Sequence, residues 1–238
     1  MINMTLIKNK KLSEFGKKGV TIRWKRHHKN ISDNLKNKNK FNHLLLKARL
    51  CGFLAGDGTV KIRVENKRKN ATHYEIYFYP DHPSLIKAYL EAFTELYGKK
   101  PLVKNEGNYY RVRTQCKVTC LDLLKVCKFG VHSWTVPFNF LTNDKLKKEW
   151  LRAFFDCESY VGKKVVQLQS VNKKGLNQIN NILKEFGIES KIYKYKRKNK
   201  NWNINYILCI MKEDARRAYL DKIGFNHDIK LTKLKKQF

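Results

Sequence analysis

The stretch Leu50-Cys51-Gly52-Phe53-Leu54-Ala55-Gly56-Asp57-Gly58 decides how the rest of this chain can fold. A second version occurs later, Leu151-Arg152-Ala153-Phe154-Phe155-Asp156-Cys157-Glu158-Ser159. Aligned on their final acids, both have small residues at the third and seventh places, which are Gly52 and Gly56, then Ala153 and Cys157. Small residues four apart share one helix face and let another backbone approach closely. We therefore expect the two helices to pack on these faces, with Asp57 and Glu158 side by side at one end.

The pattern around each stretch repeats the same order of elements. After the first helix, from Leu44, the sequence predicts strands over 59–64 and 74–79, a helix over 84–97, strands over 101–105 and 109–115, and a helix over 119–127. After the second, from Asp144, it predicts a strand over 163–170, a helix over 176–186, strands over 190–196 and 202–210, a helix over 214–222, and a basic tail over 231–236. Period-two alternation in the strands indicates one buried and one exposed face. The expected fold class is α+β, a duplicated αββαββα repeat.

The composition points to a polyanionic partner. The chain has 238 residues, with 51 Lys and Arg against 20 Asp and Glu, a formal charge of +31. So basic a protein usually binds nucleic acid, and an anionic membrane surface is the second candidate. No apolar run approaches the roughly 20 residues that span a bilayer, and no signal-peptide pattern occurs, so we expect a soluble, intracellular protein without a membrane partner. The six cysteines form no Cys-x-x-Cys pair, which favours reduced, buried thiols over structural zinc.

The first segment, residues 1–43, is a basic extension. Its charge is concentrated at 8–11, 23–26 and 36–40. A solvated arm and an arm that lies along phosphates are both compatible with this pattern, and Trp24 between basic residues mildly favours the second.

The two motif stretches resemble the twin motifs of LAGLIDADG homing endonucleases, in the single-chain form with two motifs. The resemblance covers about residues 44–238, and it implies one repeat over 44–143 and a second over 144–238. It further implies a pseudo-twofold mixed α/β fold, in which two saddle-forming antiparallel sheets flank a central pair of motif helices. Such a protein would act as a monomer on double-stranded DNA, without an obligate protein partner.

Two acids at helix C-termini repel each other and oppose the helix dipole, and a divalent cation relieves both effects. The resemblance implies that Asp57 and Glu158 hold two or more Mg2+ ions, with Gly56 and Cys157 completing the metal site. Mn2+ would substitute, and Ca2+ would bind without efficient cleavage. Cutting would leave short 3′ overhangs. Lys230 is the expected catalytic lysine of the second half. The first half has no lysine at the matching place, so either His132 takes that role or the role is lost. The place of a polar strand-end residue falls at Pro80 and Asp81 in the first half, and at Gln169 and Ser170 in the second. Ser159 departs from the family's glycine.

The exposed strand faces would read DNA, because a β-ribbon fits the major groove. The expected DNA-binding residues are Lys61, Arg63, Tyr77, Arg111, Arg113, Gln167, Gln169, Ser170, Lys194, Lys196 and Asn203. Base readout and phosphate contact remain open for each. Two other functions share the basic surface: an intron maturase of the same fold that helps RNA splice, and a structural nucleic-acid-binding protein. Retention of both acids favours DNA cleavage.

Overall fold

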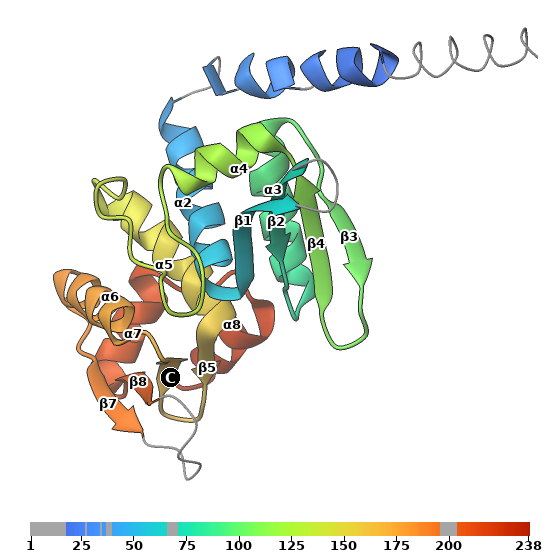
Figure 1. Ribbon diagram of the computed structural model, residues 1–238. Coiled ribbons are helices and arrows are strands. Elements are labelled where there is room, and N and C mark those ends of the chain that lie inside the picture. The colour runs from blue at the N-terminus through green and yellow to red at the C-terminus, as the bar shows by residue number, and fades with distance from the viewer. Residues whose placement is uncertain (1–17, 27, 34, 37–39, 66–70, 196–203) are drawn as a thin grey trace, which may run out of the picture.

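The fold is a duplication around two central helices (Figure 1). The computed structural model describes residues 18–26, 28–33, 35–36, 40–65, 71–195 and 204–238. The first half runs α2 (Lys40–Asp57), β1 (Gly58–Glu65), β2 (Ala71–Phe78), α3 (Pro83–Tyr97), β3 (Leu102–Asn105), β4 (Tyr110–Gln115) and α4 (Lys117–Leu124). The second runs α5 (Asp144–Glu158), β5 (Ser159–Val161), β6 (Val166–Ser170), α6 (Lys173–Glu185), β7 (Lys191–Tyr195), β8 (Asn205–Ile210), α7 (Glu213–Lys222) and α8 (Asp228–Lys235). The expected mixed α+β class with its duplicated repeat is confirmed.

Each half contributes one four-stranded antiparallel sheet. The strand orders are β1-β2-β4-β3 and β5-β6-β8-β7, so the two halves have the same topology. In Figure 1 the two sheets lie on opposite sides of the α2–α5 pair. In the first sheet Val60, Ile76, Phe78 and Val112 form the buried face. Phe78 stacks on Tyr89 of α3, with ring centroids 4.7 Å apart, which anchors the sheet on the helices.

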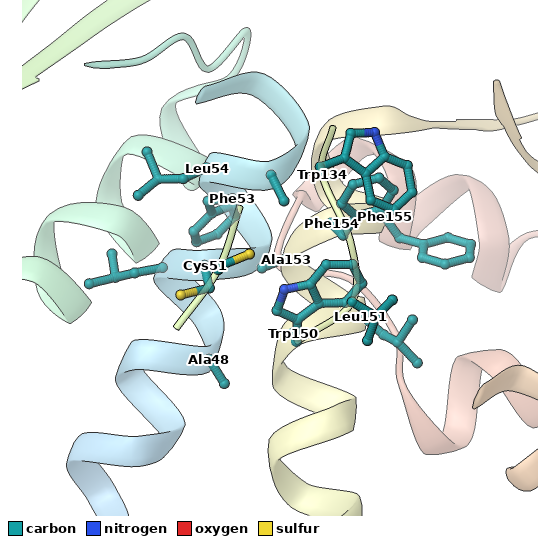
Figure 2. Packing of buried hydrophobic residues seen from close by; sticks show 14 of the residues in the cluster. Ala48, Cys51, Phe53, Leu54, Trp134, Trp150, Leu151, Ala153, Phe154 and Phe155 are labelled. Atoms are coloured by element: carbon teal, nitrogen blue, oxygen red, sulfur yellow. The ribbon is translucent and has the colours of Figure 1, made fainter. Parts of the chain in front are cut away.

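The small residues of the two stretches make the helix crossing. A Cβ atom placed on Gly52 would stand 2.4 Å from Trp150 O and 2.8 Å from Ala153 Cβ, and one on Gly56 would stand 2.6 Å from Cys157 Cβ. Backbones this close leave no room for a side chain, so the glycines are required by the neighbouring helix. Figure 2 shows Ala48 and Cys51 of α2 in the same interface as Trp150 and Ala153 of α5. The packing expected from the sequence is therefore confirmed.

Local signals fix the ends of several helices. Pro83 stands in the first turn of α3, and Gly98 ends that helix with φ 65°. The Asn143 side chain accepts a hydrogen bond from Leu146 N at 3.1 Å at the start of α5. Gly187, with φ 70°, follows α6 in the same left-handed conformation as Gly98. These boundaries agree with the predicted ones to within a few residues.

The structure corrects the sequence prediction in four places. Residues 61–64 of β1 are exposed on both faces, because this end of the strand extends beyond the core. The strand predicted over 163–170 begins only at Val166, as β6, and it pairs with the short strand β5, which the sequence did not predict. The turn between them includes Gly162, whose N–H bonds Val165 O at 3.0 Å. The helix predicted over 119–127 begins at Lys117 and ends at Leu124. The predicted basic tail is the helix α8, whose Leu234 is fully buried.

The remaining expectations concern the thiols, the membrane and the basic extension. The six cysteines, all in the described part of the chain, are free thiols, and all but Cys157 are buried. No helix among the described residues is long and apolar enough to cross a membrane. In the extension, residues 18–26, 28–33 and 35–36 are helical, and Ile31 is buried against the core. The basic group at 8–11 lies outside the described residues.

Candidate active site

Both motif helices end where a strand begins, so each final acid stands at the junction of a helix and a sheet. After Asp57 the chain enters β1 at Gly58, where a Cβ atom would lie 2.5 Å from Leu54 Cα. After Glu158 it enters β5 at Ser159, with φ −90° and ψ 149°, an extended conformation open to any residue. The Ser159 hydroxyl donates to Phe155 O at 2.6 Å. The departure from glycine at this place therefore leaves the helix end and the position of Glu158 intact.

Asp57 and Glu158 lie close enough to perturb one another. A Cβ atom on Gly56 would be 3.4 Å from Glu158 Cγ, so the Glu158 side chain runs alongside the end of α2. Burial raises the pKa of Glu158 to about 7, and the negative charge of Asp57 adds to this rise. Burial also raises the pKa of Asp57, together with the charge of Asp81, while Lys230 opposes it. Two half-buried carboxyl groups whose ionisation is disfavoured in this way are suited to receive a cation.

The pair fits an ion that is completed by oxygens from elsewhere. Among the described residues, no three His, Cys, Asp or Glu side chains gather as a metal cage. Mg2+ commonly binds through one or two carboxylates together with substrate phosphates and water, which is what Asp57 and Glu158 allow. The Cys157 thiol donates to Phe53 O at 3.7 Å across the helix interface, and burial raises its pKa far above the usual range. Cys157 and Gly56 could therefore contribute only backbone carbonyl oxygens.

A lysine and a third acid surround Asp57. Lys230, in the first turns of α8, donates from Nζ to Asp156 O at 2.5 Å and to Cys157 O at 3.2 Å. Burial lowers the pKa of Lys230, while the nearby charges, including those of Asp81 and Asp57, raise it. Asp81 follows β2, and its Oδ1 lies 3.7 Å from Nε2 of the buried His227. The structure thus brings three of the sequence-selected residues, Asp57, Asp81 and Lys230, to one place.

The surroundings of Glu158 are different. A cavity of about 300 Å3 beside Glu158 is lined by Ala55, Gly56, Gly58, Thr59, Gly130, Val131, Trp134, Gln169, Ser170, Val171 and Asn205. Gln169 and Ser170, chosen from the sequence as the polar strand-end residues, are thus next to this acid. His132 is exposed on the loop after Gly130 and does not line the cavity. None of these described lining residues is a lysine or arginine, although the charge of Lys230 lowers the pKa of Glu158 as it does that of Asp57.

Sequence reasoning missed Asp156, a fully buried acid two residues before Glu158. Its Oδ1 accepts hydrogen bonds from Asn226 N at 2.9 Å and from His227 N at 3.0 Å. Its Oδ2 accepts from Asn226 Nδ2 at 2.8 Å. Burial raises the pKa of Asp156 to about 6, and these hydrogen bonds counteract part of the rise. The one available signal was an acid on the apolar side of a helix, since such a group needs buried partners.

The register of the first sheet places the predicted DNA-binding residues of that half on one face. Lys61 pairs with Glu75, Tyr77 pairs with Arg113, and Lys104 pairs with Arg111, all on the side away from the core. The Arg113 guanidinium lies 5.7 Å over the Tyr77 ring. Glu75 holds Lys61 at 3.7 Å and Arg63 at 3.9 Å. The face of the first sheet that is turned away from the core therefore combines lysine and arginine side chains, held by neighbouring groups, with tyrosine rings.

The second sheet separates its predicted residues. Gln167 and Gln169 share one face because they are two residues apart on β6. Cys209 and Lys191 belong to the same face, since Gln167 pairs with Cys209 and Cys209 pairs with Lys191. Lys194 and Ser170 both pair with Tyr206, so they belong to the opposite face, the one that includes the buried Leu168 and Leu208. Lys194 is exposed at the strand end. Lys196 and Asn203 lie outside the described residues. The sheet face turned away from the core in this half therefore includes the two glutamines but not Lys194 or Ser170.

Comparison with known proteins gives one matching family model. A model described as LAGLIDADG-like domain matches residues 145–224. Two curated relatives come from Methanocaldococcus jannaschii: a glutamine–fructose-6-phosphate aminotransferase, 24% identical over 78% of this chain, and a replication factor C small subunit, 27% identical over 83%. The chain spans only 17% and 10% of their respective lengths. Because those two names describe unrelated activities, the segment that both proteins share with this chain does not assign either activity to it.

Solved structures match over most of the chain. A variant of I-DmoI in complex with its target DNA in the presence of Mg is 17% identical, with a TM-score of 0.61, covering 78% of this chain and 98% of that one. I-DmoI in complex with DNA and Ca is 18% identical, with a TM-score of 0.60, covering 76% and 90%. Full-length DUF199/WhiA from Thermatoga maritima is 14% identical, with a TM-score of 0.52, covering 87% and 65%. At these identities the likeness establishes the fold.

Proposed function

We propose that the chain is a two-motif protein of the LAGLIDADG family and a divalent-metal-dependent DNA endonuclease that makes a double-strand break in one long asymmetric site. The observation that supports this most is the placement of Asp57 and Glu158 at adjacent helix ends, where burial raises the pKa of both acids and the charge of Asp57 adds to the rise at Glu158. Two acids at adjacent helix C-termini oppose the helix dipoles and repel each other, so this arrangement lowers the stability of the metal-free fold. The similarity to I-DmoI, whose structures include DNA with Mg, Ca or Mn, supports the same proposal.

In this proposal the motif acids hold the cations. Asp57 and Glu158 supply the carboxylate oxygens, and the carbonyl oxygens of Gly56 and Cys157 are the other candidate ligands. Divalent ions, when bound there, activate water and stabilise the leaving oxygen of a phosphodiester. Lys230 brings a positive charge beside Asp57 that can orient water or offset phosphate charge, and His132 is the corresponding candidate of the first half. Mn2+ should support cutting, and Ca2+ should support binding alone.

The sheets hold the DNA. The first sheet offers Lys61, Arg63, Tyr77, Arg111 and Arg113, and the second offers Gln167 and Gln169, on faces turned away from the core. Arginine suits guanine and glutamine suits adenine in the major groove. The two halves differ in these side chains, so the preferred site should be asymmetric. A single chain provides both acids, so a monomer is sufficient for cutting both strands with short 3′ overhangs.

A cleavage selection tests the proposal. The protein is incubated with a randomised duplex library and Mg2+, and the cut ends are sequenced. We expect one recovered site, cut on both strands, and no cutting with a chelator. If the protein cuts no duplex but binds structured intron RNA, the maturase function replaces the proposal. If Mg2+ has no effect on any activity, a structural nucleic-acid-binding role replaces it.

Two variants and a control then assign the roles. Asp57→Asn and Glu158→Gln each keep the side-chain shape and remove one charge. We expect both to lose double-strand cutting by at least about 10²-fold while still binding the recovered duplex. Asp144→Asn, an exposed acid in the first turn of α5, is the matched control and should cut normally. Wild-type cutting of both strands by either motif variant would contradict the assigned roles.

A further inference from the structure

Asp156 connects the second motif helix to the start of α8. Its carboxylate is fully buried and accepts three hydrogen bonds from the two residues that precede α8. The donors are the backbone N–H groups of Asn226 and His227 and the side-chain amide of Asn226. A carboxylate that receives backbone N–H groups at the start of a helix is a strong, directional anchor. The anchor sets where the first turns of α8 lie relative to the end of α5.

Lys230 is the residue that this anchor places. A few residues after Asn226, its Nζ returns to the same helix end and donates to Asp156 O and Cys157 O. On the other side of the anchored loop, the His227 ring stacks on His82, with centroids 4.6 Å apart, and faces Asp81. The loop is therefore held between α5 and the first half of the molecule, and Lys230 is fixed on the backbone of α5, where its charge acts on Asp57 and Asp81 and also on Glu158.

The first half has no equivalent of this anchor. Aligned on the motif acids, the position of Asp156 is occupied by Ala55, which cannot accept a hydrogen bond through its side chain. The corresponding loop after Gly130 is held instead by Asn172, whose Nδ2 donates to Trp134 O at 2.6 Å. That loop contributes Gly130, Val131 and Trp134 to the cavity beside Glu158, and no cationic side chain among the described lining residues.

We propose that Asp156 is a positioning residue that holds Lys230 at the end of α5, so that the side of the site next to α8 works with an ordered lysine and the side next to the loop after Gly130 works without one. This inference rests on the proposed nuclease function. Its consequence is that the two DNA strands are cut by chemically unlike half-sites, and that damage to the anchor falls on one strand. A residue needed only for folding would affect both strands equally.

The experiment follows each strand separately. A duplex of the selected site is labelled with a different dye on each strand, and single-turnover cutting is measured for the wild type, Lys230→Met and Asp156→Ala. We expect Asp156→Ala to slow one strand by on the order of 10²-fold and the other by less than about threefold. The slowed strand should be the one that Lys230→Met slows. The double variant should be no slower than Lys230→Met alone, because both changes remove the same group from its place.

Further variants cover the case in which Asp156→Ala unfolds. Asn226→Ala removes one of the three hydrogen bonds and should slow the same strand by about tenfold. Asp156→Asn combined with Asn226→Asp exchanges acceptor and donor, and should restore the strand ratio relative to Asp156→Asn alone. Equal slowing of both strands, or additive loss in the double variant, would overturn the inference while leaving the nuclease function standing. No cutting by the wild type would instead overturn the proposed function.

Discussion

The close helix contact at Gly52 can be tested by adding a single methyl group. Gly52→Ala would place its Cβ 2.4 Å from Trp150 O, 2.8 Å from Ala153 Cβ and 3.2 Å from Phe154 N. Ordinary van der Waals contact begins near 3.4 Å, so the two helices must separate by up to 3.4 − 2.4 = 1.0 Å at this point. Overpacking of this kind costs about 1–3 kcal/mol.

The same substitution also has a favourable part, which a control variant measures. Alanine gains about 1 kcal/mol over glycine in a helix, and this gain offsets part of the overpacking. Gly19 lies in a helical segment with no atom within 4 Å of an added Cβ, so Gly19→Ala gains without a clash. We expect Gly52→Ala to be less stable than Gly19→Ala by about 1–3 kcal/mol in urea unfolding.

The functional readout of Gly52→Ala is independent of its stability. Moving the helices apart by as much as 1.0 Å would also move Asp57 away from Glu158, and misplacement on this scale can cost about 10²-fold in rate. Cutting of the selected duplex should therefore fall by about that factor at a temperature where the variant is fully folded. If Gly52→Ala matches Gly19→Ala in both stability and cutting rate, the acids do not depend on this helix contact.

Three further outcomes follow from the charges of the molecule. Burial and the charge of Asp57 raise the pKa of Glu158 from 4.5 to about 7, so its ionisation lowers the stability of the folded protein by up to about 3 kcal/mol, an effect absent below about pH 4.5 and complete above pH 7. Glu158→Gln should therefore stabilise the metal-free protein by up to that amount near pH 8 and not near pH 4.5. Thermal unfolding with a chelator measures this, and equal effects at both pH values would contradict it. With a charge of +31, DNA affinity should fall by about 10³–10⁵-fold between 50 and 200 mM salt in fluorescence anisotropy, and a flat response would exclude phosphate contacts as the main source of affinity. Arg113→Ala should weaken binding by about 1–3 kcal/mol, whereas Lys194→Ala, on the other sheet face of its half, should change it by less than about 0.5 kcal/mol; equal losses would mean that the strand register does not decide contact with DNA.

Much of the architecture could be predicted because it depends on local patterns. Gly52 and Gly56 are four residues apart on an apolar helix, and this spacing alone indicates a close helix partner. Pro83 and Gly98 mark the ends of α3 through their backbone preferences, which need no tertiary information. The acids Asp57 and Glu158 could be selected because the motif occurs twice and ends in the same chemistry.

The features that could not be predicted depend on partners far away in the sequence or on which face of a sheet a strand residue occupies. The donors to Asp156 come from residues 70 and 71 positions away, and nothing in the local sequence names them. Lys194 and the glutamines of β6 all lie on strands with mixed patterns, so only the pairing register shows that they face opposite sides. The strand β5 has 3 residues, too short for alternation to be visible, and α8 has few apolar positions because it packs mainly through Leu234.

Binding of Mn2+ to the protein–DNA complex tests most directly whether the two motif acids hold the metal together. Electron paramagnetic resonance can count free Mn2+ while the ion is titrated into wild type, Asp57→Asn, Glu158→Gln and Asp144→Asn, each bound to the selected duplex. We expect wild type and Asp144→Asn to take up Mn2+ alike, and each motif variant to lose at least about tenfold in affinity or one bound ion. Unchanged uptake in both motif variants would show that the cation is held elsewhere.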